Sequence, residues 1–452
     1  MNLDSFKNIY FIGIGGIGMS ALARYFNSRD KIVVGYDRVM SPLCKQLQEE
    51  GMEVHTDDRG DDVAKQGFTP ENTLVISTPA VPETHGEKSY FRSHDFKLLK
   101  RSEILGLLTA EMKGLTVAGT HGKTTTSTML AHVLKGTSKK TSAFLGGIST
   151  NYNTNLLIEE DSDWVVIEAD EFDRSFLHLH PFASIITSTD ADHLDIYKDK
   201  QDLVDAFQSF AELVAKDGFV VKHVDADVAP KVKTISYGIQ EESDYQASNL
   251  RIENGYFVMD VITPKAKWSD VVLGLPGIHN AENALSVLAL LDQLQVDEAA
   301  IRQGLKTFKG VKRRFEYHIR KENLVYIDDY AHHPTAIDQL LKSVRMMYPN
   351  KKITAVFQPH LYSRTNDFMD GFASALSRAD ETILMPIYPA RELPMEGVTS
   401  NVLASKMTNE VTVIDTQQAV LDYLEQQNLE VILTIGAGDI DQIVEPLKAA
   451  LS

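Results

Sequence analysis

The stretch "VAGTHGKTTTSTML", residues 117–130, joins an apolar run to a Gly-Lys-Thr sequence. An apolar strand, a glycine loop with a lysine and a following helix are typical of a phosphate site, because amides at a helix N-terminus attract anions. The common loop, G-x-x-x-x-G-K, is longer, whereas Gly119 and Gly122 here enclose only Thr120 and His121. A helix merely capped by threonines is the alternative, but capping does not require a lysine beside an apolar strand. The stretch therefore predicts a shortened nucleotide-binding loop on a parallel α/β sheet.

The composition is that of a soluble chain of several domains. Its 452 residues, 43% hydrophobic and 24% charged, are enough for about three ordinary domains. The formal net charge of −18 disfavours nucleic acid and anionic membranes as partners. Cys44 is the single cysteine, which excludes an internal disulfide and fits a reducing compartment. Because we see neither a basic leader nor a stretch that could span a bilayer, we expect a cytoplasmic protein without membrane insertion, as a monomer or weak homodimer.

A second glycine loop lies near the start, in "NIYFIGIGGIG", residues 8–18. It follows an apolar strand and precedes a helix, and Asp37 ends the next strand, where an acid that binds a ribose is expected. This fingerprint indicates a diphosphate and a ribose, so NAD and a UDP-sugar both fit, and a tight turn without ligand is the third possibility. The residues of the fingerprint leave these three possibilities open. The residues expected to bind such a nucleotide, whether NAD or a UDP-sugar, are Gly13, Gly15, Gly16, Gly18, Asp37 and Ser77.

Short strands alternate with helices along the whole chain, which predicts parallel sheets with helices on both faces. We expect three domains in series: a Rossmann-like domain over residues 1–107, a central domain with a P-loop ATPase-like sheet over 108–314, and a C-terminal Rossmann-like domain over 315–452. "LRIENGYFVMDV", residues 250–261, alternates about an Asn-Gly pair and predicts a hairpin. The helix expected from residue 335 has one apolar face, formed by Ile337, Leu340, Leu341 and Val344.

Further motifs follow the central loop in a fixed order. "GTHGKTTT" is followed by "IEAD" at 167–170, "DADHLD" at 190–195 and "HNAEN" at 279–283. In this set the chain resembles the Mur ligases, the ATP-dependent amide-forming enzymes of peptidoglycan assembly, whose phosphate loop has the same short spacing. "GVKRRFE", "DDYAHHPTAI", "FQPHLYSRT" and "IYPARE" extend the resemblance over nearly the whole chain. They are similar to the member of the family that adds alanine.

The resemblance implies that ATP activates a carboxylate as an acyl phosphate, which an amine then attacks. The implied substrates are UDP-N-acetylmuramate and L-alanine, with ATP and Mg²⁺ as cofactors. The expected ATP-binding residues are Gly119, Thr120, His121, Gly122, Lys123, Thr124, Thr125, Asn283, Arg314 and Asp329. The expected metal ligands are Thr124, Glu168 and His193. Tyr330, His332 and Arg364 are expected to contact the amino acid, and the expected catalytic residues are Lys123, His193, Arg364, His332 and His360.

Two departures from the family pattern bear on the choice of member. The chain has Leu361-Tyr362 where many alanine-adding members have Arg-Tyr, and "LVDAFQSF", residues 203–210, lacks the lysine that several later Mur ligases carry there. The second departure favours the alanine-adding reaction. The recycling ligase that attaches a whole peptide is the closest alternative. A dehydrogenase or a non-catalytic nucleotide-binding regulator would leave Lys123, Glu168 and His193 unexplained.

Overall fold

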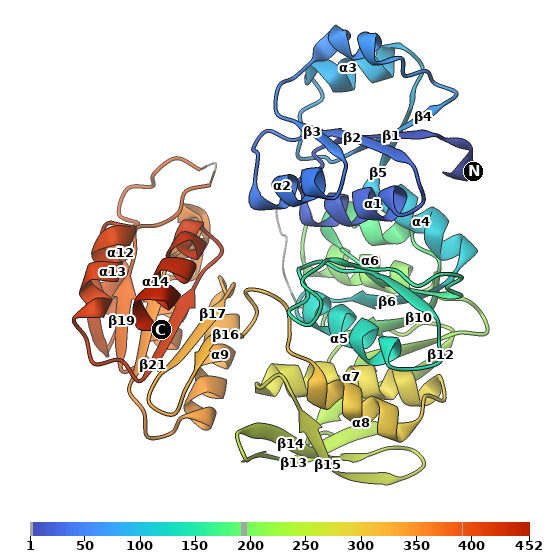
Figure 1. The fold of residues 1–452 in the computed structure, drawn as a ribbon. Helices are drawn as coiled ribbons and strands as arrows, with labels where there is room; N and C mark the ends of the chain where they lie inside the picture. Colours follow the sequence, from blue (N-terminus) through green and yellow to red (C-terminus); the bar gives the residue numbers. More distant parts are fainter. Residues whose placement is uncertain (1–2, 191–196, 391) are drawn as a thin grey trace. The chain divides into compact units, whose positions relative to one another are not determined.

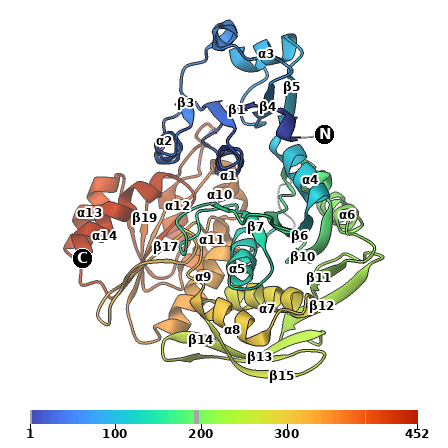
Figure 2. The same cartoon turned by 45° about the vertical axis from the view of Figure 1, so that its right-hand side comes forward.

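The computed structural model describes residues 3–190, 197–390 and 392–452. The chain divides into two compact units, each described by itself (Figures 1 and 2). Unit 1 consists of Met1–Ser248, Asp260–Val271 and Glu282–Phe308, and unit 2 consists of Asn249–Met259, Val272–Ala281 and Lys309–Ser452. In the described part of the chain, no helix is long and apolar enough to cross a membrane.

The N-terminal part of unit 1 is a five-stranded sheet in the order β3-β2-β1-β4-β5, with every pair parallel. Side chains of β1 alternate between two cores: Ile9 and Phe11 belong to one, and Tyr10 and Ile12 to the other. Helix α1 covers the first face and α3 the second, as Figure 1 shows. The strands are β1 (Asn8–Ile12), β2 (Ile32–Tyr36), β3 (Glu53–His55), β4 (Thr73–Ser77) and β5 (Lys97–Lys100), and the helices are α1 (Ile17–Asn27), α2 (Pro42–Glu49), α3 (Gly86–Ser93) and α4 (Arg101–Glu111).

The strand order places β1 and β4 at the point where the direction of the order reverses. In such sheets, ligands bind beyond the carboxyl ends of the strands at this point. The first glycine loop follows β1, and Ser77 ends β4. The predicted Rossmann-like fold of this region is therefore confirmed, with its glycine loop at the expected edge.

The central sheet has ten strands in the order β15-β14-β13-β12-β11-β10-β6-β9-β7-β8. The strand β6, which enters the phosphate loop, lies between β9 and β10 and is parallel to both. The predicted hairpin is confirmed, since β13 and β14 are joined by Asn254 and Gly255, both with positive φ. The strands are β6 (Lys113–Ala118), β7 (Thr141–Phe144), β8 (Leu156–Leu157), β9 (Trp164–Glu168), β10 (Pro181–Ile186), β11 (Phe219–His223), β12 (Lys233–Ile239), β13 (Tyr245–Glu253), β14 (Tyr256–Ile262) and β15 (Lys267–Leu273). The helices are α5 (Lys123–Lys135), α6 (Lys200–Ala211), α7 (Ile278–Gln293) and α8 (Glu298–Thr307).

The third sheet, in unit 2, has the order β16-β17-β21-β18-β19-β20, with β16 antiparallel and the remaining pairs parallel. Helices α13 and α14 pack on one face through Val420, Leu424 and Leu447 (Figure 2). The predicted apolar face of α9 is confirmed, because all four of its residues are buried. The strands are β16 (Glu316–Arg320), β17 (Val325–Asp329), β18 (Ile353–Phe357), β19 (Glu381–Leu384), β20 (Glu410–Val413) and β21 (Val431–Ile435), and the helices are α9 (Pro334–Met347), α10 (Tyr362–Asp367), α11 (Met369–Leu376), α12 (Ser400–Lys406), α13 (Gln417–Glu425) and α14 (Val444–Leu451).

The three sheets confirm an α/β chain of three serial folds. The domain bounds that we expect at residues 107 and 314 stay predictions. Helix α4 runs through residue 107, and β6 begins at Lys113. The hydrophobic core of the first sheet continues into the second through Ile104, Leu105 and Leu108 of α4, which explains why both sheets belong to one compact unit.

Candidate active site

The phosphate loop is shaped by two glycines. Gly119 has φ +131, and a Cβ there would lie 2.0 Å from Thr187 Oγ1; Gly122 has φ +78 and is the N-cap of α5. Ser188 fixes the residues between them: its hydroxyl bonds the Thr120 hydroxyl at 2.7 Å and accepts the His121 N–H at 3.1 Å. The first helical bond runs from Thr126 N–H to Gly122 O, so the amides of residues 123–125 lie ahead of it at the positive end of α5.

Lys123 is held inside this loop. Its ammonium donates to Gly119 O at 2.8 Å and to the buried carboxylate of Glu171, also at 2.8 Å. Burial by itself lowers the pKa of Lys123, yet Glu171, Asp170 and Glu168 together raise it above the ordinary lysine value. The lysine therefore keeps its charge although it is largely buried. Glu171 is not among the residues predicted from the sequence. The stretch "EADE", residues 168–171, gives it no signal except its position near the expected metal ligand Glu168.

Glu168 ends β9 beside the loop. Its Oε2 is buried without a hydrogen-bond partner among the described residues. Burial and Asp170 raise the pKa of Glu168, while Lys123, a hydrogen bond from Thr124 and Arg101 lower it. A buried carboxylate oxygen without a donor, next to a threonine hydroxyl, is the kind of oxygen pair that holds a divalent cation. Thr124 and Glu168 thus fit the metal site expected from the sequence.

Asn283 and Thr125 are also expected to contact ATP. Asn283 lies directly against the phosphate loop, since a Cβ on Gly122 would be 2.6 Å from its Oδ1. Thr125 is a buried residue of α5. His193, the second expected metal ligand, lies outside the residues that the structure describes.

The first glycine loop differs from the phosphate loop in the side chains that surround it. Gly13 has φ +91, and Gly15 leaves no room for a side chain, because a Cβ would lie 2.5 Å from Cys44 Sγ. Asp37, expected to bind a ribose, has an Oδ2 that accepts the Gly15 N–H at 2.8 Å and an Oδ1 that accepts the Val39 N–H at 3.2 Å. Asp37 thus stabilises the backbone of the glycine loop at Gly15, and its contact with a ribose stays a prediction. Gly16 is the N-cap of α1 and Ser77 is buried.

Arg101 connects the surroundings of the two loops, and sequence reasoning missed it. A Cβ on Gly18 would lie 2.1 Å from its Nη1, so the guanidinium rests on the first turn of α1. Its charge also helps to lower the pKa of Glu168. A cation beside the positive end of a helix favours an anion there. "KRSE" at 100–103 reads as an ordinary helix start, which explains the omission.

In unit 2, Asp329 ends β17, and its carboxylate accepts the Phe315 N–H at 2.7 Å and the Ala331 N–H at 2.8 Å. Burial raises the pKa of Asp329 to about 6, although Arg314 and these two donors lower it. The neighbouring arginines differ. Both lie over the Tyr330 ring, Arg313 at 5.2 Å and Arg314 at 5.1 Å, but Arg313 also donates to Asp328 at 3.1 Å and to Gly436 O at 2.8 Å.

The residues expected around the amino acid lie together in unit 2. The rings of His332 and His360 are 6.3 Å apart, and Arg364 Nη1 is 3.4 Å from His360 Nδ1. Burial lowers the pKa of His332 to about 4, and burial with Arg364 lowers the pKa of His360. Both imidazoles are therefore neutral near pH 7 and able to accept a proton. The roles of these residues stay predictions.

Leu361, the departure noted in the sequence, has φ +70 and ψ 137. Its N–H donates to Tyr388 O at 2.9 Å, which fixes this backbone directly before α10. A non-glycine residue in this region stores on the order of 1–3 kcal/mol of strain, and such residues cluster at functional sites. This backbone lies directly before α10, the helix that carries Arg364.

Comparison with known proteins gives a consistent result along the chain. Three family descriptions match: "Mur ligase family, catalytic domain" over residues 8–113, "Mur ligase middle domain" over 117–291, and "Mur ligase, glutamate ligase domain" over 313–438. The curated UDP-N-acetylmuramate--L-alanine ligase of Cytophaga hutchinsonii is 46% identical, covering 99% of this chain and 97% of its own.

Solved structures agree. The UDP-N-acetylmuramate-alanine ligase of Thermotoga maritima is 28% identical, with a TM-score of 0.85 over 98% of this chain and 99% of its own. A murein peptide ligase from Psychrobacter arcticus is 22% identical, with a TM-score of 0.70 over 98% of each chain, and shares the fold. With both glycine loops, Lys123 and Glu168 in place and relatives aligned from end to end, this chain belongs to the Mur ligase family.

Proposed function

We propose that this protein is an ATP-dependent amide ligase that joins L-alanine to the lactyl carboxylate of UDP-N-acetylmuramate during the synthesis of peptidoglycan precursors. The observation that carries the proposal is the charged Lys123, held between Gly119 O and Glu171 at the N-terminus of α5. Support comes from the full-length relatives that bear the name of this reaction, several of them 44–48% identical. The departure at residues 203–210 fits the same choice.

The first step brings together two anions, the sugar carboxylate and the γ-phosphate of ATP. Charge neutralisation and positioning supply most of the catalysis of phosphoryl transfer. Lys123 and the amides of residues 123–125 provide fixed positive charge, so the carboxylate oxygen attacks phosphorus and ADP leaves. The product of this step is an acyl phosphate.

Mg²⁺ belongs to the proposal through two residues. The Thr124 hydroxyl and the unpartnered Glu168 Oε2 are the described oxygens that would hold it. When bound, a magnesium ion neutralises the charge that develops on the transferring phosphoryl group. His193 remains the proposed third ligand.

The second step needs an amine without its extra proton. His332 fits the acceptor, because its Nδ1 lies 3.0 Å from Tyr330 O and so carries the hydrogen, which leaves Nε2 free to take a proton. Arg364 would hold the alanine carboxylate by two parallel hydrogen bonds. Attack of the amine on the acyl phosphate then forms the amide and releases phosphate. We place the reaction in the cytoplasm, where ATP and nucleotide sugars are found.

The first glycine loop would bind the diphosphate of the sugar nucleotide. The positive end of α1 and the Arg101 guanidinium both favour an anion there. A dehydrogenase would use this loop alone and would leave Lys123, Glu171 and Glu168 without a role. We therefore assign the loop to UDP-N-acetylmuramate rather than NAD.

The test is phosphate release from ATP with Mg²⁺ and UDP-N-acetylmuramate, with L-alanine, glycine, L-serine or the murein tripeptide as acceptor. We expect release to be strongest with L-alanine. Release with tripeptide alone would make the chain a recycling ligase. Silence with every acceptor, by a folded protein that binds ATP, would instead favour a nucleotide-binding regulator.

A further inference from the structure

A buried asparagine links the first glycine loop to the second. Asn155 directly precedes β8 and has an exposed fraction of 0%. Its Nδ2 donates to Ile17 O at 2.6 Å and to Ser20 Oγ at 2.9 Å, and its Oδ1 accepts from Arg24 Nη1 at 2.5 Å. These partners are spaced so that they share one face of α1. One side chain thus makes three hydrogen bonds to the helix that follows the first loop.

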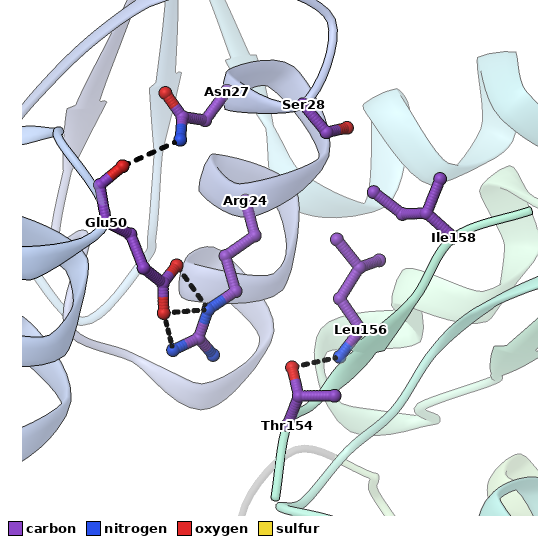
Figure 3. A pocket seen from close by; sticks show the side chains of 7 residues that line it. All are labelled: Arg24, Asn27, Ser28, Glu50, Thr154, Leu156 and Ile158. Atoms are coloured by element: carbon purple, nitrogen blue, oxygen red, sulfur yellow. Dashed lines mark hydrogen bonds and ion pairs between the residues drawn. The ribbon is translucent and has the colours of Figure 1, made fainter. Parts of the chain in front are cut away.

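Arg24 is itself fixed on the α1 side. Glu50 accepts from its Nε and Nη2 at 2.7–3.0 Å, as Figure 3 shows. This arrangement leaves Nη1 to donate to Asn155. Arg24 and Glu50 line a pocket of about 420 Å³, with Thr154 and Leu156 opposite them in Figure 3. Two residues that line the pocket, Thr154 and Leu156, flank Asn155 in the sequence. The guanidinium is therefore held from both sides rather than left to move.

The backbone of Asn155, unlike its side chain, contacts the residue that follows β7. Its carbonyl accepts the Leu145 N–H at 2.9 Å. The next residue, Gly146, touches the expected metal ligand, since a Cβ there would lie 1.9 Å from Glu168 Oε2. A path thus runs from α1 through Asn155 to Leu145, along the chain to Gly146, and from there to the carboxylate of Glu168.

We propose that Asn155 is a positioning residue that holds the sugar-nucleotide loop in register with the ATP loop. This inference rests on the proposed function. The carboxylate that attacks phosphorus belongs to a molecule whose diphosphate is bound at α1, so the offset between the two loops decides how close the reacting atoms come. A misplacement of about 1 Å costs about 10²-fold in rate when the reacting groups must be aligned.

The test is Asn155→Ala, measured as kcat and KM for UDP-N-acetylmuramate, ATP and L-alanine in turn. We expect kcat/KM for the sugar nucleotide to fall by about tenfold or more, while KM for L-alanine stays within about twofold. The matched control is Asn8→Ala. Asn8 is also buried, but its amide bonds Asn72 and Thr73 inside the first sheet, so its loss should lower stability without altering this kinetic split.

Ser20→Ala provides a milder second variant for the case that Asn155→Ala folds poorly. If the two residues act through one contact, their effects on kcat/KM are non-additive, whereas those of Asn8 and Asn155 add. Equal kinetic losses in the Asn155 and Asn8 variants, or strict additivity with Ser20→Ala, would overturn the proposal. A wild-type protein that releases no phosphate with any acceptor would instead refute the proposed function itself.

Discussion

The two glycine loops of unit 1 have the same local design but different surroundings. Each follows a buried parallel strand and opens a helix whose N-cap is a glycine without a side-chain hydrogen bond, Gly16 in one and Gly122 in the other. Around the first loop, Asp37 accepts the Gly15 N–H and Arg101 rests on Gly18. Around the second, Lys123 is enclosed with Glu171, and Glu168 has a buried oxygen to which no described residue donates.

The difference shows what a glycine pattern by itself indicates. Positive φ and a missing Cβ allow a backbone to approach phosphate in either loop. Transfer of a phosphoryl group needs a fixed cation together with oxygens able to hold a metal. The first loop has the cation Arg101, but the Asp37 carboxylate there accepts backbone N–H groups, whereas the second loop has Lys123 beside Glu168. We therefore expect the first loop to bind and the second to react, and the following experiments test that division.

The largest effect is expected for Lys123→Ala. Without the ammonium, the phosphoryl oxygens lose their fixed positive charge, and kcat should fall by about a thousandfold. Phosphate release measures this, with Lys135→Ala at the far end of the same helix as control. Calorimetric binding of UDP-N-acetylmuramate should be unchanged. If that binding weakens as much as kcat falls, sugar-nucleotide binding and phosphoryl transfer do not belong to separate loops.

A pair of neighbouring glycines separates structure from binding in the first loop. In Gly15→Ala the new Cβ meets Cys44 Sγ at 2.5 Å, so overpacking should cost about 1–3 kcal/mol of unfolding free energy. In Gly16→Ala the nearest atoms are 3.7 Å away, and φ −65 suits alanine, so stability should not change. A raised KM for the sugar nucleotide in Gly16→Ala, with normal urea unfolding, would place the ligand at this backbone; an unaltered KM would remove it from there.

Glu171→Gln tests how Lys123 is held. Glutamine keeps the shape but not the charge, so the lysine loses its buried counterion and its alignment. We expect kcat to fall about tenfold, with KM for ATP changed by less than about threefold. Exposed Glu160→Gln is the control, and steady-state kinetics are the measurement. A faster Glu171→Gln enzyme would mean that Glu171 restrains the lysine instead of positioning it.

The smallest effect is a pH dependence within the helix of the second loop. Burial lowers the pKa of His132, on α5, to about 4, and its ring nitrogens contact Tyr152 and Thr307 hydroxyls. The native state then binds fewer protons than the unfolded chain between pH 6.5 and 4, so stability present above pH 6.5 is lost as pH falls through this window. Urea unfolding at pH 5 and 7.5 should show a loss on the order of 1 kcal/mol that His132→Asn removes. An equal loss in the variant would exclude His132 as its source.

The sequence predicted the fold class and both loops, because strand–glycine–helix patterns are local and their periodicity survives in any context. The apolar face of α9 and the Asn254-Gly255 turn were predicted for the same reason and are confirmed. The sequence did not indicate Glu171, Arg101 or Asn155. Their importance lies in contacts with residues distant along the chain, and each has a flanking sequence that reads as ordinary strand end, helix start or loop.

Residues adjacent in the chain were therefore enough to predict a phosphate site, since a lysine behind a glycine loop requires only neighbours in the sequence. Which charged side chains are already bound to another part of the protein depends instead on the tertiary structure. Arg313 and Arg314 both lie over the Tyr330 ring, but Arg313 is also bound by Asp328, and Asp37 accepts a hydrogen bond from the loop that precedes it. The physical reason is that burial makes an unsatisfied polar atom costly, so the fold assigns partners according to distance in space, which the order of residues does not record.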